Sequence, residues 1–155
     1  MNIISFAQAE IIADSILARS RELNLRPMSV VIVEPGNIAK CFKKEDHASS
    51  IRLEMAMGKT YAALALGRSS LLVQKRAQQR PMFIDFLQHA SQQQIFAEGG
   101  GRLIRNADGE VIGAVGVTGD RQEVDDEVAA WGIHAANLKT DEDCAGMGQL
   151  VRLDD

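Results

Sequence analysis

The sequence contains few cysteines, prolines and aromatic residues, and it has no long apolar run. Only 2 of its 155 residues are cysteines, and Cys41 and Cys144 are too far apart in the sequence to form a CxxC pair. This spacing indicates neither a zinc site nor a disulfide framework. No apolar run reaches the length of a membrane-spanning helix, and the first ten residues lack the basic and apolar segments of a secretory signal. We therefore expect a cytoplasmic protein with no membrane partner.

The chain also lacks an excess of positive charge. Its 17 lysines and arginines stand against 21 acidic side chains, and the net charge of -4 opposes nonspecific attraction to phosphate backbones. We therefore expect no nucleic-acid partner. The length and the 46% hydrophobic content are typical of one globular domain, and aromatics of only 5% indicate an aliphatic core. We expect a single domain over residues 1–140 and an acidic tail or arm over residues 141–155.

Apolar residues at spacings of three and four predict five helices. Ser5 with Gln8, and Asp120 with Glu123, each match a capping box at a helix start. Pro81 divides two shorter helices because proline cannot donate a backbone hydrogen bond. The expected helices are Ser5–Leu23, a second one capped by Asp46, Ser49 or Ser50 and ended by Gly67, then Ser70–Gln79, Pro81–His89 and Asp120–Leu138.

Two pairs of apolar segments joined by turn residues predict two β-hairpins. Pro35-Gly36 favours a type II turn, and Asp108-Gly109 is a strong hairpin signal. The four expected strands are Met28–Val33, Ile38–Phe42, Leu103–Arg105 and Val111–Thr118. Tight turns between strands disfavour a parallel sheet, which needs helical crossovers.

Both central strands are apolar at alternate positions on both faces, so helices must cover both faces of the sheet. In the last strand, one face is expected to hold Val111, Val115 and Val117, and the other Ile112 and Ala114. The predicted fold class is α+β, with three αβα layers, a central antiparallel sheet and the element order αββαααββα.

Several motifs together resemble one known family. They are Gly99–Gly101, Asp108-Gly109, Val111–Gly119 with Asp125, Ala129 and Gly132, the first hairpin at Val31–Gly36, and a helix with Ala56, Lys59, Thr60 and Ala62. The sequence resembles the GlcG/HbpS-like family of haem-binding proteins, which also includes the C-terminal domain of PduO-like corrinoid adenosyltransferases. The resemblance implies a profilin-like fold, assembly into homo-oligomers, and the binding of haem or another small ligand in some members. Arg102-Leu103 departs from the family, which commonly has valine and proline there.

The lysine helix and the glycine segment are the candidate ligand-binding site. A partly desolvated Lys59 amine would bind a carboxylate or act as a base or Schiff-base amine, and the structural alternative is an ion pair with Glu54 or Asp46. Backbone N–H groups near the glycines would bind an anion, whereas the alternative is close packing of strand and helix. The candidate ligand-binding residues are Lys59, Met55, Gly99, Gly100, Gly101, Thr118 and Gly119.

Three histidines, His47, His89 and His134, are available as candidate ligands for haem iron. His47, beside Asp46 in a charged loop, is the most accessible candidate for an axial ligand, and the alternative is a solvated loop histidine. His134 follows Trp131 by one turn and is expected to serve packing or an interface.

These residues support three hypotheses of different classes. The first is a homo-oligomeric accessory or sequestration protein that binds haem or a related small molecule between the lysine helix and the glycine segment. The second is an isomerase or lyase that uses Lys59 on a small carboxylate intermediate of a catabolic pathway. The third is a purely structural or regulatory accessory subunit.

Overall fold

An antiparallel sheet of four strands lies at the centre of the molecule. The computed structural model describes residues 2–147, 151 and 153. Its elements are α1 (Phe6–Glu22), β1 (Ser29–Glu34), β2 (Ile38–Lys44), α2 (Arg52–Leu66), α3 (Ser70–Gln79), α4 (Pro81–Ala90), β3 (Gly101–Arg105), β4 (Val111–Thr118), α5 (Gln122–Ala135) and a short 3-10 helix, η1 (Glu142–Cys144). The predicted order of helices and strands is confirmed as far as α5.

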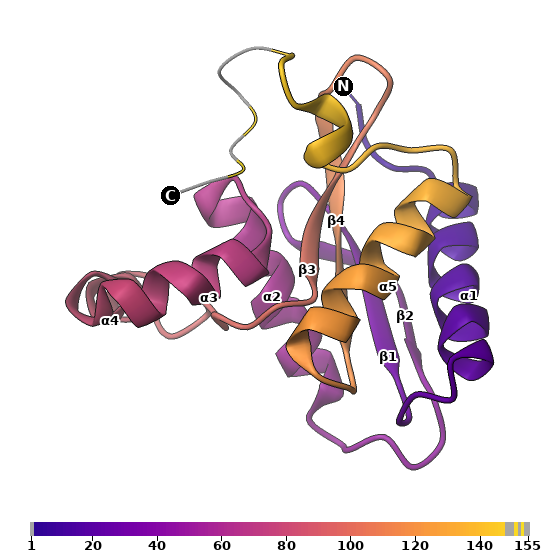
Figure 1. Ribbon diagram of the computed structural model, residues 1–155, viewed down its shortest axis with the longest axis horizontal. Helices are drawn as coiled ribbons and strands as arrows, with labels where there is room; N and C mark the ends of the chain where they lie inside the picture. The colour runs from indigo at the N-terminus through magenta and orange to yellow at the C-terminus, as the bar shows by residue number, and fades with distance from the viewer. Residues whose placement is uncertain (1, 148–150, 152, 154–155) are drawn as a thin grey trace.

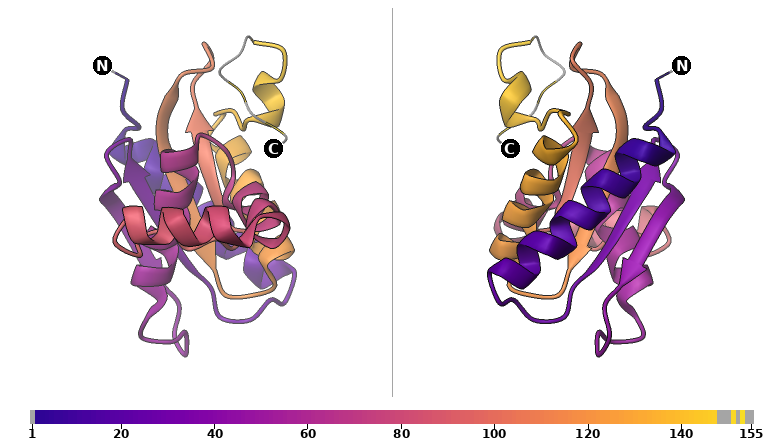
Figure 2. Two further views of the ribbon diagram at one scale, coloured as in Figure 1. Left: turned by 90° about the vertical axis from the view of Figure 1, so that its left-hand side faces the viewer. Right: turned by 90° about the vertical axis from the view of Figure 1, so that its right-hand side faces the viewer.

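The sheet has the strand order β2-β1-β4-β3, so the two hairpins meet through β1 and β4. Helices α1 and α5 pack together on one face and α2 covers the other, as Figures 1 and 2 show. Helices α3 and α4 extend this second side outward from α2 (Figure 1). The three-layer α+β architecture with an antiparallel sheet is confirmed. None of the described helices is both long enough and apolar enough to cross a membrane.

One bulge in β4 changes which side chains share a face. Ile104 pairs with Gly113 and Arg105 pairs with Val111, so Ile112 is the extra residue. Ile112 therefore packs under α1 and α5 with the core residues Val115 and Val117, whereas Val111 and Ala114 pack under α2. The face assignment expected from strict alternation was wrong at this end of the strand.

The first hairpin uses a different turn from the one expected. Gly36 does not have a positive φ, and the left-handed residue is instead Asn37, with φ 61°. The Asn37 N–H donates to the Glu34 carbonyl at 2.8 Å. This is the three-residue loop in which a turn is followed by one left-handed residue, a conformation that asparagine tolerates. The type II turn was therefore wrong, although the hairpin itself is confirmed.

The helix starts follow the sequence signals only in part. The predicted capping box of α1 is confirmed, because Ser5 Oγ accepts the Gln8 N–H at 3.1 Å and Gln8 Oε1 accepts the Ser5 N–H at 3.0 Å. Helix α2 has no side-chain cap from Asp46, Ser49 or Ser50. That part of the prediction was wrong, because the chain continues through one more turn before α2 begins.

Asp120 does not cap α5 through the expected pairing with Glu123. Helix α5 starts at Gln122 without a side-chain cap, and the Asp120 carboxylate accepts the backbone N–H groups of Arg121 and Arg26 instead. It therefore ties the start of α5 to the loop before β1. The helix also ends at Ala135, three residues before the expected end.

The segment after α5 folds back on β3. Lys139 exchanges backbone hydrogen bonds with Arg105, and the Arg105 guanidinium forms a buried ion pair with Asp141 at 2.7 Å. Cys144 is also buried. Residues 141–144 therefore pack against the domain, while much of the expected tail lies outside the described residues.

Candidate functional site

Lys59 is completely buried on the sheet side of α2. Its ammonium donates to the Val117 carbonyl at 2.9 Å and to the Asp125 carboxylate at 3.3 Å, and Glu98 lies 3.9 Å away. Burial lowers the Lys59 pKa, although the two carboxylates oppose this shift. The acidic partners of the Lys59 amine are thus Asp125 of α5 and Glu98 in the segment before β3. The expected pairing with Glu54 or Asp46 was wrong.

Asp125 is the carboxylate at the centre of this cluster. Its side chain is 1% exposed, and it accepts backbone N–H groups from Gly119 at 3.2 Å and Asp120 at 2.9 Å in addition to the Lys59 ammonium. Burial raises the Asp125 pKa to about 6, against the opposing effect of these donors. Asp125 therefore occupies the position in which the sequence placed the carboxylate of a ligand.

The N–H groups of the glycine segment also have internal partners. Gly99 donates to the side chain of Gln122 at 3.0 Å, and Gly101 donates to Ser70 Oγ at 2.7 Å. Thr118 is buried, and its carbonyl accepts a hydrogen bond from an arginine of α2. The N–H groups of Gly99 and Gly101 thus already have acceptors within the protein. Anion binding by the glycine segment and the Thr118-Gly119 turn stays a prediction.

The glycines let the start of β3 approach α2 directly. A Cβ atom on Gly101 would overlap the Lys59 carbonyl oxygen, and one on Gly100 would overlap the Val117 carbonyl oxygen. Gly100 also has a φ of 122°, which favours glycine. The two segments meet, as expected from the sequence, but at these glycines they pack directly against each other. The alternative interpretation, close packing, describes this contact.

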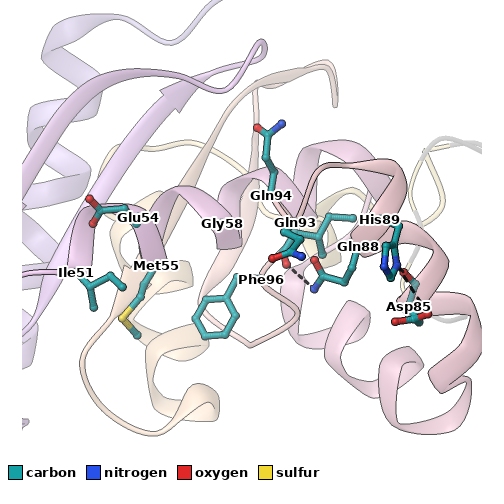
Figure 3. Close-up of a pocket in the computed structure, with 11 residues that line it drawn as sticks. Ile51, Glu54, Met55, Gly58, Asp85, Gln88, His89, Gln93, Gln94 and Phe96 are labelled. Carbon is teal, nitrogen blue, oxygen red and sulfur yellow. Dashed lines mark hydrogen bonds and ion pairs between the residues drawn. The ribbon is translucent and has the colours of Figure 1, made fainter.

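An open groove of about 520 Å³ lies on the opposite, outer side of α2. Helix α2 forms one wall, α4 forms another, and the segment that leads toward β3 completes it (Figure 3). Met55 and Phe96 lie side by side at one end, whereas Asp85, Gln88 and His89 project from α4 at the other (Figure 3). Of the candidate residues named from the sequence, Met55 lines this groove.

The hydrogen bond made by His89 determines which of its ring nitrogens is available to a metal. Its Nδ1 lies 2.9 Å from the Asp85 carbonyl oxygen, and because a carbonyl only accepts, Nδ1 carries the proton. In the neutral ring this tautomer leaves the lone pair on Nε2, the arrangement typical of histidines that bind metals. The side chain is 74% exposed, so Nε2 is accessible from the groove.

Comparison with known proteins adds an independent observation. The family model described as "Haem degrading protein HbpS-like" matches residues 4–134. The chain belongs to the HbpS-like family. The predicted resemblance is confirmed by this match, which covers most of the sequence.

Solved structures share the fold of this HbpS-like domain. The structure described as a PduOC:Heme complex has a TM-score of 0.79 and 23% identity, covering 89% of this chain and 98% of that one. Klebsiella pneumoniae protein ORFY has a TM-score of 0.76 and 24% identity, covering 88% and 92%. A double mutant of Streptomyces reticuli HbpS has a TM-score of 0.74 and 19% identity, covering 86% and 87%. No protein with a curated description matches the chain.

The other histidines of the HbpS-like domain lie outside the groove. His47 is exposed in the loop before α2, beside a hollow lined mainly by charged side chains such as Arg21 and Lys44. His134 is hydrogen-bonded to Asp143 at 2.7 Å. Among the described residues, no three His, Cys, Asp or Glu side chains gather to hold a metal ion by themselves. Haem ligation by His47 stays a prediction.

The sequence reasoning did not single out His89 or Phe96. Helix α4 has the strongest separation of apolar and polar faces among the helices, and His89 lies one turn after Asp85 on its polar side. This pattern could have identified His89 from the sequence. No sequence pattern could have identified Phe96, because it lies in an irregular segment whose position depends on the packing of Gly58 against it.

Proposed function

We propose that this HbpS-like domain binds haem in the groove between α2 and α4, as an accessory or sequestration protein. One observation carries the proposal: the groove joins an apolar surface to His89, an exposed histidine whose Nδ1 is hydrogen-bonded to the Asp85 carbonyl oxygen. Two further facts support it. The family model is described as haem degrading, and a protein of the same fold is described as a heme complex.

The apolar part of the groove suits a porphyrin ring, whereas its charged lining residues, Glu54 and Asp85, are both acidic. Its volume of about 520 Å³ falls within the usual range for ligand pockets, roughly 300–1,000 Å³. Met55 and Phe96 offer a polarizable sulfur and an aromatic ring to the flat macrocycle. His89 would hold the iron through Nε2, while its Nδ1–H donates to the Asp85 carbonyl oxygen. Bound haem would supply a redox-active iron centre, held by His89.

The enzyme hypothesis based on Lys59 has weaker support. The Lys59 amine has no exposed surface and is held by Val117 and Asp125. A substrate would have to open the contact between α2 and the glycine segment to reach it. Lys59 is better explained as part of the internal ion cluster.

A hemin titration with matched histidine variants tests the proposal. We expect wild-type protein to give a saturable change in the Soret band, His89→Ala to weaken hemin binding by at least about tenfold, and His47→Ala to bind as wild type. Circular dichroism of each variant verifies that the fold is intact. Both side chains are exposed, but His47 has a φ of 70°, so His47→Ala should cost some stability without changing hemin binding of the folded protein.

Two results would contradict this assignment. No saturable Soret change with wild-type protein would reject haem binding itself. Loss of binding in His47→Ala but not in His89→Ala would move the iron ligand to the loop before α2, where the sequence placed the candidate axial histidine.

A further inference from the structure

The charged side chains that line the groove between α2 and α4 are both acidic. They are Glu54 of α2 and Asp85 of α4, and no lysine or arginine lines the groove. Both are exposed, and the structure pairs neither of them with a lysine or arginine of the described residues. The Lys59 ammonium lies 5.8 Å from the ring centre of Phe96 but is already paired with Asp125. The groove therefore has a negative potential, which attracts cations and repels anions.

Two other polar side chains of the groove are oriented by hydrogen bonds so that they present acceptors. The Gln88 amide nitrogen donates to the Ile95 carbonyl at 2.7 Å, so Gln88 Oε1 is left as an acceptor. His89 donates from Nδ1 to the Asp85 carbonyl, which leaves a lone pair on Nε2 of the neutral ring. The remaining side-chain amides of the lining can donate or accept. Together with the two carboxylates, these acceptors favour a ligand that is rich in N–H donors.

The two carboxylates lie at opposite ends of the groove, with apolar surface between them. Figure 3 shows Glu54 at the end beside Met55 and Asp85 at the other end on α4, with the ring of Phe96 between the two ends. Met55 offers a polarizable sulfur, and the aromatic ring of Phe96 attracts cations as well as methylene groups. A ligand that meets both carboxylates therefore needs a cationic group at each end and an apolar chain in the middle.

We propose that this groove binds a linear aliphatic diamine, with one ammonium group at Glu54, the other at Asp85, and the methylene chain across Met55 and Phe96. The groove volume of about 520 Å³ is in the usual range for small-molecule pockets. The inference does not rest on the proposed haem function, because it follows from the charges and acceptors of the lining and not from an iron ligand. Hemin and a diamine would compete for the same groove.

The affinity should be modest because both carboxylates are exposed. An ion pair between exposed groups is weak and is screened by salt. We expect each ammonium–carboxylate pair to strengthen binding by about twofold to fivefold, and dissociation constants of about 0.1–1 mM at low ionic strength. The second pair forms only if the chain reaches both ends of the groove. A diamine should therefore bind more tightly than the monoamine of equal length only once its chain spans the two carboxylates.

Isothermal titration calorimetry with matched amines tests the ligand class. Unbranched diamines from diaminopropane to diaminodecane should include lengths that bind saturably, about twofold to fivefold more tightly than the monoamine of the same length. Free lysine, which is cadaverine with one added carboxylate, should bind more weakly than cadaverine, and the corresponding dicarboxylates should not bind. Absence of saturable binding by every diamine, or dicarboxylates that bind as tightly as the diamines, would overturn the inference.

Substitutions at the two ends of the groove test where the diamine lies. Glu54→Gln and Asp85→Asn each remove one carboxylate from an exposed position and should leave the fold intact, which circular dichroism verifies. In either variant a diamine should bind no more tightly than the monoamine of the same length, because only one ion pair remains. Glu123→Gln, at an exposed acid of α5 on the other face of the sheet, is the matched control and should keep the wild-type preference for diamines. A preference that persists in Glu54→Gln or in Asp85→Asn would overturn the proposed placement.

A hemin titration of the same protein separates this inference from the haem proposal. Protein that binds hemin but no diamine retains the haem function and rejects diamine binding, and the reverse result retains diamine binding and rejects haem. If both ligands bind, hemin should displace the diamine. Hemin and a diamine that bind together, while Glu54→Gln and Asp85→Asn still lose the preference for diamines, would place haem outside the groove and support the diamine site.

Discussion

Glycines make close contacts on both sides of helix α2, but only the outer side has an open groove. On the sheet side, Cβ atoms on Gly116 of β4 and Gly101 of β3 would come within 2.4 Å of the carbonyl oxygens of Ala56 and Lys59. On the outer side, Gly58 is buried, and its Cβ would come within 2.7 Å of Phe96. The groove opens beside this contact, where α4 stands apart from α2.

The charges differ between the two sides as well. The buried side pairs Lys59 with Asp125, both almost without exposed surface. The groove side has exposed polar side chains, including His89 and Asp85 at 74% exposure each. Substitutions on the buried side are therefore expected to lower the free energy of unfolding, and substitutions on the groove side to lower ligand affinity.

The largest expected effect comes from removing the buried cation. Lys59→Met keeps the length of the side chain but leaves the Asp125 carboxylate without its partner in a site that is 1% exposed. We expect the free energy of unfolding to fall by about 3–5 kcal/mol in urea denaturation at neutral pH. Lys75→Met, at an exposed lysine of α3, is the control and should change it by less than about 0.5 kcal/mol. An equal effect of the two substitutions would show that the Lys59 pair is not desolvated.

The buried Asp125 carboxyl should also make the free energy of unfolding depend on pH. Burial raises the folded-state pKa of Asp125 to about 6 from 3.8, so the folded protein holds this proton more tightly than the unfolded chain. The stability from this group is present below about pH 4 and is lost as the pH rises to about 6, by at most about 1.4 kcal/mol per pH unit. Urea midpoints of wild type relative to Asp125→Asn should fall over that window. A relative midpoint that stays flat would mean that Asp125 titrates normally.

A smaller loss is expected when a methyl group is added at the close contact. Gly101→Ala would force the Lys59 carbonyl away and should cost about 1–3 kcal/mol of unfolding free energy. Gly36→Ala is the matched control, because its Cβ would meet only Ile38 at an ordinary 3.5 Å. Hemin affinity of the folded protein should be unchanged in both variants. Specific loss of hemin binding in Gly101→Ala would instead place the ligand at the glycine segment.

The smallest expected effect is on the groove side. Phe96→Ala should weaken hemin binding by about threefold to tenfold, because the aromatic ring no longer contacts the macrocycle. Phe6→Ala, on the opposite face of the domain, should leave the titration unchanged. Fluorescence or Soret titration measures both. Equal affinities of the two variants would argue against a macrocycle lying on Phe96.

Local patterns predicted the elements well and their details less well. Ser5 and Gln8 marked the start of α1 correctly because a capping box is made by residues three apart. Strict alternation misplaced Ile112, since a bulge depends on how β4 pairs with β3. Asp120 had the sequence signature of a cap, but the backbone of Arg26, 94 residues away, competes for its carboxylate. Each error involves a partner that is distant in the sequence.

The sequence by itself determined the helices, the two hairpins, the burial of both sheet faces and the family. These follow from periodicity and turn chemistry within short segments, or from motifs along the chain. Only the tertiary structure decided that Asp125, 66 residues from Lys59, would neutralise it, and that the groove would open toward His89. The physical reason is that ion pairs and grooves form between elements whose distance in space is set by packing and not by their separation in the sequence.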